Sequence, residues 1–144
     1  MKLSMKLSAL TLALAFSANV FAHGAVTPQA IDTSTIPQLG EEWADTNPYR
    51  DVEGDTKTEI IRVGASAYNQ NCARCHGLEA ISGGIAPDLR YLASDFDGDE
   101  WYVYRVKNGA VRNGAVYMPK MTEHLSQEAL WAVRSFVESV AVAQ

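Results

Sequence analysis

The sequence is short of cysteine, histidine and long apolar segments, and each shortage excludes a class of protein. Its 144 residues include only two cysteines and three histidines, too few for a disulfide-rich scaffold or an array of metal sites. Beyond the N-terminus no apolar run approaches the length of a membrane-spanning helix. Acidic residues outnumber basic ones, which argues against a nucleic-acid-binding protein. No internal repeat or low-complexity tract is present.

The N-terminus has the pattern of a signal peptide. Lys2 and Lys6 precede a short apolar run over residues 7–16, and small residues surround the expected cleavage position after Ala22. An uncleaved membrane anchor is the alternative, but the run is short and no stop-transfer charges follow it. We therefore expect removal of residues 1–22, a mature chain that begins near His23, and export to a bacterial periplasm without a membrane-spanning segment.

Residues 23–57 form an acidic segment with three of the five prolines and no sustained periodicity. Between His23 and Glu59 eight acidic residues face only Arg50 and Lys57. A disordered linker would have such a composition. The segment also carries apolar residues that a solvated tail does not need: Ile31, Ile36, Leu39, Trp43 and Tyr49. We therefore expect an N-terminal arm that packs on the surface of a single domain, formed by residues 58–144.

Residues 58–144 have the pattern of an all-α domain with long loops. Apolar and small residues with helical spacing run from position 60 to Cys72. A short helix is expected from about Asp99 to residue 108, capped by Asp97 or Asp99. Ser126 is a suitable N-cap for the last helix, which has a continuous apolar side. Loops are expected over residues 77–97 and 110–124, and no strand is expected.

Both cysteines lie in one C-x-x-C-H motif, formed by Cys72, Cys75 and His76. A redox-active pair follows a strand in a thioredoxin-like setting, whereas this pair closes a helix. Zinc needs four ligands, and the fourth would have to be the distant His124. A disulfide within the motif would close too small a loop to stabilise much. Covalent attachment of one haem c uses all three residues: cysteines at i and i+3 reach two vinyl groups, and the histidine reaches the iron.

The sixth ligand of such an iron separates two functional classes. A filled position makes an electron carrier, and an open one binds or activates small molecules. Met118 is the expected ligand, because a soft thioether favours reduced iron and Pro119 stiffens the loop. Met121, His124 and a vacant position are the alternatives. The expected metal ligands are therefore His76 and Met118.

The order of these motifs resembles the class I cytochromes c. The resemblance covers residues 58–142 and rests on the segments CARCH, GGIAPDLR and YMPKM. It implies three to four helices and long loops wrapped around one covalent haem c. It also implies that Pro87 offers its carbonyl to the haem-ligating histidine. The first and last helices would cross where Gly64 and Tyr68 meet Trp131 and Phe136.

Several charged and aromatic residues are candidates for contacts around the haem. Arg90 and Arg105 are expected to face the haem propionates, with Trp101 or Tyr104 as an additional donor. Three basic residues flank the attachment motif and the methionine loop and define an expected basic rim at the exposed haem edge: Arg74, Arg112 and Lys120. The alternative is that these side chains are simply solvated.

A narrower resemblance concerns the arm segments HGAVTPQ and LGEEWADTNPYR together with the region around the motif. They are similar to the soluble cytochromes c that serve pyrroloquinoline quinone (PQQ)-dependent alcohol dehydrogenases, the ethanol-oxidising kind in particular. This implies a periplasmic mono-haem electron carrier, not an enzyme, which accepts single electrons from such a quinoprotein and passes them toward a terminal oxidase or another cytochrome. The alternatives are a gas-binding or enzymatic haem module with a vacant or labile sixth ligand, and a carrier for a different periplasmic dehydrogenase.

Overall fold

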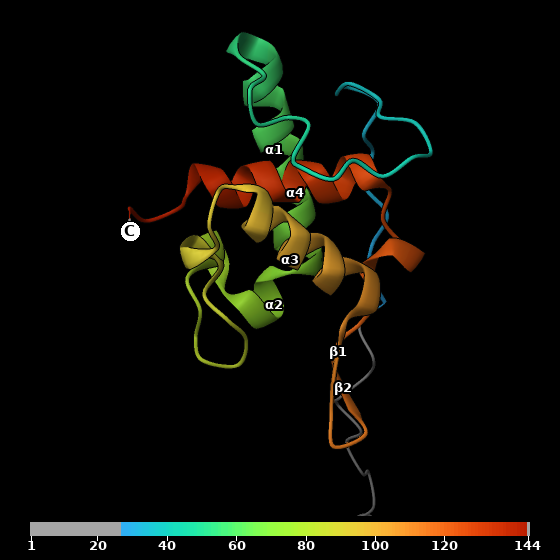
Figure 1. The fold of residues 1–144 in the computed structure, drawn as a ribbon, viewed down its shortest axis with the longest axis vertical. Helices are drawn as coiled ribbons and strands as arrows, with labels where there is room; N and C mark the ends of the chain where they lie inside the picture. Colours follow the sequence, from blue (N-terminus) through green and yellow to red (C-terminus); the bar gives the residue numbers. More distant parts are fainter. Residues whose placement is uncertain (1–26, 144) are drawn as a thin grey trace, which may run out of the picture.

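The computed structural model describes residues 27–143, so the expected signal peptide over residues 1–22 and the start of the arm lie outside it. Within this range the helices are α1 (Gly54–Asn71), α2 (Ala73–His76), α3 (Phe96–Asn108) and α4 (Gln127–Ser139). Short 3₁₀ turns connect them: η1 (Leu78–Ala80), η2 (Leu89–Tyr91) and η3 (Met121–Glu123). The expected helical class is confirmed (Figure 1). None of the helices described is long and apolar enough to cross a bilayer.

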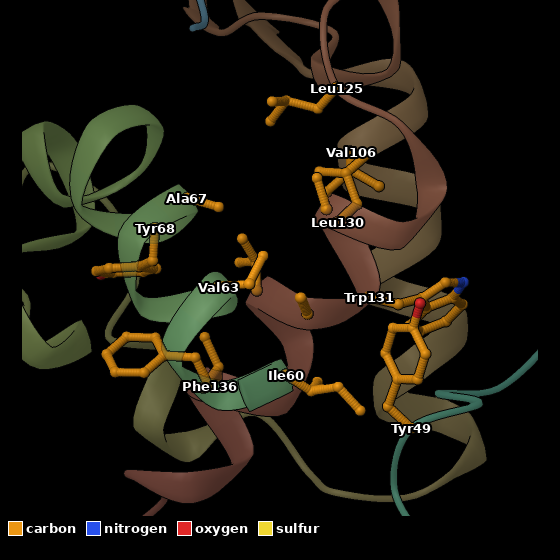
Figure 2. Packing of buried hydrophobic residues seen from close by; sticks show 14 of the residues in the cluster. Tyr49, Ile60, Val63, Ala67, Tyr68, Val106, Leu125, Leu130, Trp131 and Phe136 are labelled. Atoms are coloured by element: carbon orange, nitrogen blue, oxygen red, sulfur yellow. The ribbon is translucent and has the colours of Figure 1, made fainter. Parts of the chain in front are cut away.

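Helices α1 and α4 cross at a glycine. A Cβ atom at Gly64 would lie 1.9 Å from the carbonyl oxygen of Ala132, so only glycine lets the two backbones approach this closely. Beside the crossing, the rings of Tyr68 and Phe136 pack with centroids 5.1 Å apart. Figure 2 shows the apolar core that surrounds this contact. The crossing therefore joins the helix before the motif to the last helix of the chain.

Trp131 was expected at the same crossing, but its ring packs elsewhere in the core. It lies 5.9 Å from the ring of Tyr102 on α3 and 6.3 Å from the ring of Trp43 in the arm. Trp131 is fully buried. Its place is therefore where α4, α3 and the arm meet.

Helix α3 begins earlier than the sequence pattern predicts, and a different residue caps it. The cap is Asp95, whose carboxylate accepts a hydrogen bond from the backbone N–H of Gly98 at 2.9 Å. Asp97 and Asp99, the expected caps, lie in the first turn instead. Asp99 points into the protein and is fully buried. It is a residue of the interior and not a helix cap.

The segment expected to be a loop over residues 110–124 contains a β-hairpin, so the expectation that no strand is present was wrong. Strand β1 (Ala110–Arg112) pairs antiparallel with β2 (Ala115–Met118). The turn is Asn113-Gly114, with positive φ angles of 50° and 77°. An Asn-Gly pair is a strong hairpin signal. The strands themselves are too short to show the alternation by which a strand is recognised in a sequence.

The described part of the arm packs against the helices. Ile36 and Tyr49 are only 4% and 1% exposed. On α4, the side-chain amide of Gln127 donates to the carbonyl oxygens of Gly40 and Glu42 at 2.6 and 2.8 Å. The arm then runs directly into α1, whose first residue precedes the expected position 58. These contacts make the arm a contributor to the core.

Candidate haem site

The C-x-x-C-H motif occupies the end of α1 and the short helix α2. The backbone N–H of Cys72 donates to the carbonyl oxygen of Tyr68 at 2.8 Å. The N–H groups of Cys75 and His76 both donate to the Cys72 carbonyl oxygen, at 3.1 and 3.0 Å. The two cysteines are not joined to each other. The motif thus forms a compact helical turn, in which residues three positions apart lie on one side.

The surroundings of the Cys72 thiol suit an uncharged sulfur atom. The residue as a whole is only partly buried, yet burial, aided by the neighbouring Cys75 thiol, raises the pKa of the Cys72 thiol to about 12. A thiol with so high a pKa is a poor thiolate ligand for zinc and a poor nucleophile. A thioether carries no charge and loses nothing in this environment. The donor set therefore fits a covalently attached haem better than a metal ion held by thiolates.

His76 is oriented by a hydrogen bond to the loop that follows the motif. Its Nδ1 atom lies 2.9 Å from the carbonyl oxygen of Pro87, which is the contact that the resemblance implies. Because a carbonyl oxygen can only accept, Nδ1 carries the proton and Nε2 keeps its lone pair for a metal ion. The chain turns tightly after the motif: a Cβ atom at Gly77 would lie 1.8 Å from the Ile81 carbonyl oxygen. The Tyr68 hydroxyl supports this turn by donating to the Gly77 carbonyl oxygen at 2.7 Å.

The three candidates for the sixth ligand lie in different environments. Met118 is half-buried at the end of β2. Met121 is 3% exposed and packs in the apolar core. His124 is exposed next to η3. A core methionine is engaged as packing, so these surroundings favour Met118, and the unexpected hairpin is the element that carries it.

An aromatic and cationic cluster lies on the exposed side of α3. The rings of Trp101 and Tyr104 stack with centroids 6.1 Å apart, and both residues are 52% exposed. The guanidinium of Arg105 lies 4.2 Å from the centroid of the Trp101 ring. Its Nη1 atom donates to the Gly109 carbonyl oxygen at 3.3 Å. The remaining guanidinium donors of Arg105 make no hydrogen bond within the described part of the chain and suit an anionic group.

Arg90 is engaged differently from Arg105. Its Nε and Nη2 atoms donate to the Asp88 carboxylate at 3.0 and 2.7 Å. This bidentate contact lowers the pKa of Asp88 to about 2. The sequence predicts that Arg90 faces a haem propionate, but two of its N–H donors are bound to the carboxylate of Asp88. The position of Asp88, two residues before Arg90, was the signal available in the sequence.

Every large apolar side chain that is strongly exposed in the described structure lies between His76 and Met118. They are Leu78, Ile81, Ile85, Tyr91, Phe96, Trp101, Tyr104, Val111, Val116 and Tyr117. Their elements, the segment after α2, helix α3 and the hairpin, lie on the same side of α4 as α2 (Figure 1). A concentration of exposed apolar surface marks a place that something covers. A flat and mostly apolar porphyrin attached at the motif fits this requirement.

Comparison with known proteins agrees with this geometry. Residues 59–137 match the family model described as cytochrome C oxidase, cbb3-type, subunit III. The chain is 63% identical to cytochrome c550 of Pseudomonas aeruginosa over 130 residues, which are 90% of this chain and 88% of that protein. The chain belongs to the cytochrome c family. Its cofactor is covalent haem c, and this cytochrome c is an electron-transfer protein and not an enzyme.

Two shorter matches are alcohol dehydrogenases of Pseudomonas putida. This cytochrome c is 47% identical over 38 residues to quinohemoprotein alcohol dehydrogenase ADH-IIG, which is 26% of this chain and 5% of that protein. It is 35% identical over 81 residues to quinohemoprotein alcohol dehydrogenase ADH IIB, which is 56% of this chain and 11% of that protein. The likeness therefore concerns a small segment of each dehydrogenase. No solved structure matches the chain.

Proposed function

We propose that this cytochrome c carries single electrons in the periplasm, from a PQQ-dependent alcohol dehydrogenase toward a terminal oxidase or another cytochrome. The observation that carries the choice of donor is the likeness to segments of two quinohemoprotein alcohol dehydrogenases. Both names combine an alcohol dehydrogenase with a haem. A separate chain similar to such a segment would receive electrons by docking to a dehydrogenase. Export through the signal peptide expected at residues 1–22 would bring it to the periplasm.

The residues of the motif are proposed to hold the haem. Cys72 and Cys75 would form the thioether bonds, and His76 and Met118 would supply the two protein ligands of the iron. The bound haem supplies one-electron exchange between ferrous and ferric iron. Pro87 supports this assignment, because its carbonyl oxygen holds His76 in the tautomer whose Nε2 can ligate.

The arginine and tryptophan residues are proposed to contact the polar edge of the haem. Arg105 stacks on Trp101, which positions the guanidinium while its outer N–H edge stays available for a propionate. Trp101 adds an indole N–H donor. Arg90 takes a smaller share in this proposal, since Asp88 already occupies two of its donors.

The basic rim is proposed as the docking surface for the dehydrogenase. Its three side chains are exposed, and none of them forms an ion pair within the described structure. Two other basic residues are instead paired with carboxylates, Arg50 of the arm with Asp99 and Arg62 with Glu59. Unpaired exposed charges act mainly on the rate of encounter. The cytochrome would therefore approach a negatively charged surface of the dehydrogenase with its haem edge in front.

The donor and the docking surface are tested together by mixing the oxidised cytochrome with a substrate-reduced PQQ-dependent alcohol dehydrogenase. We expect rapid haem reduction that slows as ionic strength rises, and a slower rate for Lys120→Glu at low salt. Asp55→Asn, which alters an exposed charge at the start of α1, serves as the control with an unchanged rate. Reduction only by a different class of periplasmic dehydrogenase would contradict the donor. A rate that does not depend on salt and is unchanged in Lys120→Glu would contradict docking through the basic rim.

The filled sixth position is tested with the two methionines. Met118→Ala is expected to keep the haem attached, lower the reduction potential and allow carbon monoxide to bind, because the iron loses its thioether. Met121→Ala is expected to keep the potential but to cost about 2–5 kcal/mol of stability, because this side chain is buried. Potentiometric titration and urea unfolding measure the two effects. Rapid binding of carbon monoxide by the wild-type ferrous protein at neutral pH would instead support a vacant site.

A further inference from the structure

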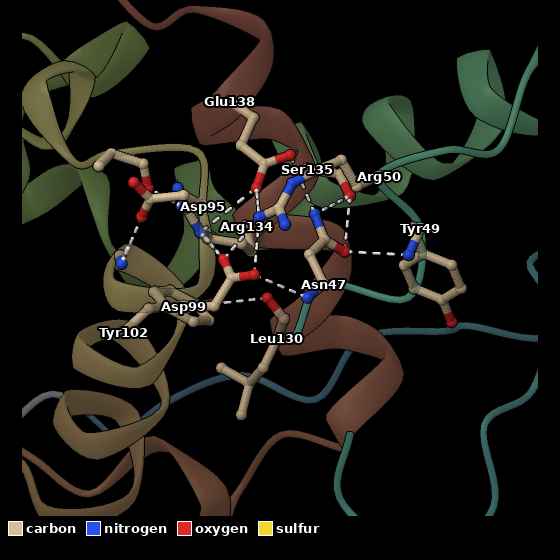
Figure 3. A network of polar contacts seen from close by, with 12 residues as sticks. Asn47, Tyr49, Arg50, Asp95, Asp99, Tyr102, Leu130, Arg134, Ser135 and Glu138 are labelled. Carbon is tan, nitrogen blue, oxygen red and sulfur yellow. Dashed lines mark hydrogen bonds and ion pairs between the residues drawn. The ribbon is translucent and has the colours of Figure 1, made fainter. Parts of the chain in front are cut away.

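Four charged side chains form a buried cluster that joins the arm to α3 and α4 (Figure 3). Arg50 comes from the arm, and its Nη2 atom lies 2.6 Å from Asp99 Oδ2 on α3 and 2.7 Å from Glu138 Oε1 on α4. Arg134 of α4 completes the cluster, with Nε 2.8 Å from Asp99 Oδ1. Two guanidinium groups face two carboxylates, so the cluster has no net charge.

The cluster is largely shut off from water. The side chains of Asp99 and Arg134 are 0% exposed, and those of Glu138 and Arg50 are 11% and 26% exposed. Asn47 of the arm covers it further: its backbone N–H donates to Asp99 Oδ2 at 2.9 Å, and its amide donates to Glu138 Oε2 at 3.1 Å. Charges in such surroundings are screened far less than charges at the surface. An unbalanced charge here would act over a long distance.

Tyr102 connects the cluster with the haem attachment motif. Its buried hydroxyl donates to the Leu130 carbonyl oxygen at 2.5 Å. The guanidinium carbon of Arg134 lies 6.0 Å from the centroid of the Tyr102 ring. Tyr102 also belongs to the apolar core against which Cys72 of the attachment motif packs. One apolar core therefore adjoins both the cluster and the attachment motif, and such a core screens an unbalanced charge far less than water does.

We propose that the arm is part of the redox centre: Arg50 supplies the charge that neutralises the buried cluster, and this neutrality helps to set the reduction potential of the haem. Without Arg50 the cluster would hold one cation against two anions and would stabilise the more positive ferric state. Without the charge of Asp99 or Glu138 it would hold two cations against one anion and would favour the ferrous state. The two kinds of change therefore shift the potential in opposite directions.

A purely structural role of the cluster gives a different pattern. If the four side chains only held the arm in place, any substitution would loosen the packing and admit water toward the haem. Solvent exposure is one of the factors that set a haem potential, and water favours the more highly charged ferric form. Every variant would then lower the potential. The direction of the shift in the variants that remove an acid separates the two accounts.

The experiment measures the midpoint potential of each holo-cytochrome by spectroelectrochemistry, with urea unfolding of the same samples. Arg50→Gln is expected to lower the potential, while Asp99→Asn and Glu138→Gln raise it. We expect each change to be about threefold in the electron-binding equilibrium, which is about 28 mV for a one-electron couple. Glu138→Gln decides the question if Asp99→Asn does not accumulate, because glutamine keeps the shape of a side chain at the edge of the cluster. Arg50→Lys retains the charge and should restore most of the wild-type potential.

The matched control is Glu42→Gln, which removes an exposed acid from the same arm. Its potential should equal that of the wild type, since water and salt screen a surface charge. Downward shifts in all cluster variants would overturn the proposal, as would shifts no larger than that of the control. The proposal rests on the haem c cofactor alone. Because the isolated cytochrome is measured, the outcome does not depend on which dehydrogenase is the donor.

Discussion

Helix α4 is joined to α1 and to α3 in opposite ways. It meets α1 backbone to backbone at Gly64, with apolar side chains around the contact. It meets α3 through the ring contact between Trp131 and Tyr102 and also through buried polar groups, because Asp99 pairs with Arg134 and the Tyr102 hydroxyl donates to a carbonyl oxygen of α4. The second junction also needs the arm, which supplies Arg50. The first junction therefore depends mainly on shape, whereas the second depends on buried charges and hydrogen bonds as well.

This difference determines which changes each junction tolerates. A close apolar contact depends on packing, so it resists changes of salt but admits no added atom. A buried polar junction suffers most when one partner is removed, because the remaining groups are left without a partner. Helix α3, which carries Trp101 and Arg105 on its exposed side, is thus held by a segment far away in the sequence.

The largest effect is expected from Gly64→Ala at the apolar junction. In an exposed helix the same change stabilises by about 1 kcal/mol. Here the added methyl group would meet the Ala132 carbonyl oxygen, and we expect a loss of more than about 3 kcal/mol in the free energy of unfolding. Urea unfolding of the holo-protein measures it. Gly83→Ala, with no atom near the added methyl group, is the control. A stabilised Gly64→Ala protein would show that the backbones are not in contact.

A smaller loss is expected from Asn47→Ala at the polar junction. The Asn47 side chain is buried and donates to Ser135 Oγ at 3.0 Å and to Glu138 Oε2 at 3.1 Å. Its removal leaves these two acceptors without the amide donor, and we expect the free energy of unfolding to fall by about 2 kcal/mol. Urea unfolding measures the loss, and limited proteolysis reports whether the arm opens. The control is Asn108→Ala, which removes an exposed amide. An equal loss of stability in both variants would contradict a specific contribution of the arm junction.

The contact between the arm and Glu128 is expected to be smaller still and to depend on pH. Burial acts to raise the pKa of Glu128, but hydrogen bonds from the Leu39 N–H and from Ser126 outweigh it and hold the pKa below the ordinary 4.5. A carboxylate with a lowered folded-state pKa stabilises the protein above its unfolded-state pKa and loses this contribution as the pH falls through the folded value. We expect Glu128→Gln to cost about 1 kcal/mol at neutral pH and to reduce the acid-induced loss of stability.

Unfolding in urea at a series of pH values from neutral to acidic measures this dependence. Ser126→Ala removes one of the groups that contact Glu128. It should reduce the acid-induced loss of stability, but by less than Glu128→Gln does. An unchanged acid slope in Glu128→Gln would contradict the role of this carboxylate.

The smallest effect is expected from Lys107→Met. The ammonium group of Lys107 on α3 lies 4.4 Å from the centroid of the Trp43 ring in the arm. Such a contact at a partly exposed site contributes about 0.5 kcal/mol, and methionine keeps most of the apolar stem. A shift in thermal unfolding beyond that of Lys120→Met would measure it. A loss of stability as large as that of Asn47→Ala would contradict the small contribution expected for this contact.

The resemblance to class I cytochromes c implied the apolar junction at Gly64 and Tyr68, whereas nothing in the sequence predicts the polar one. The spacing of Gly64 and Tyr68 along one helix is a local property, and so is the C-x-x-C-H motif. The partners of the polar junction are far apart, since Arg50 and Glu138 are separated by 88 positions. Sequence alone also does not distinguish an acidic residue that caps a helix from one that points inward. Asp99 was therefore interpreted as a cap.

Two further differences had local signals of a kind that are easily outweighed. Asn113-Gly114 indicated a hairpin, but the flanking strands are short and highly exposed. Asp88 stands two positions before Arg90, and only the turn at η2 brings the two side chains into a bidentate contact. The contact between His76 and Pro87, which the resemblance to class I cytochromes c implies, is present in the structure.

The partners of the arm lie far later in the sequence than the arm itself. Asn47 donates to Ser135, 88 positions later, and to Glu138, 91 positions later. Contacts between such distant positions carry a high cost of loop closure and form late. The crossing of helix α1 also requires α4, because α4 is its partner. A nascent chain that stops before α4 therefore has neither of its two long-range junctions, and the fold can close only after α4 has been translated.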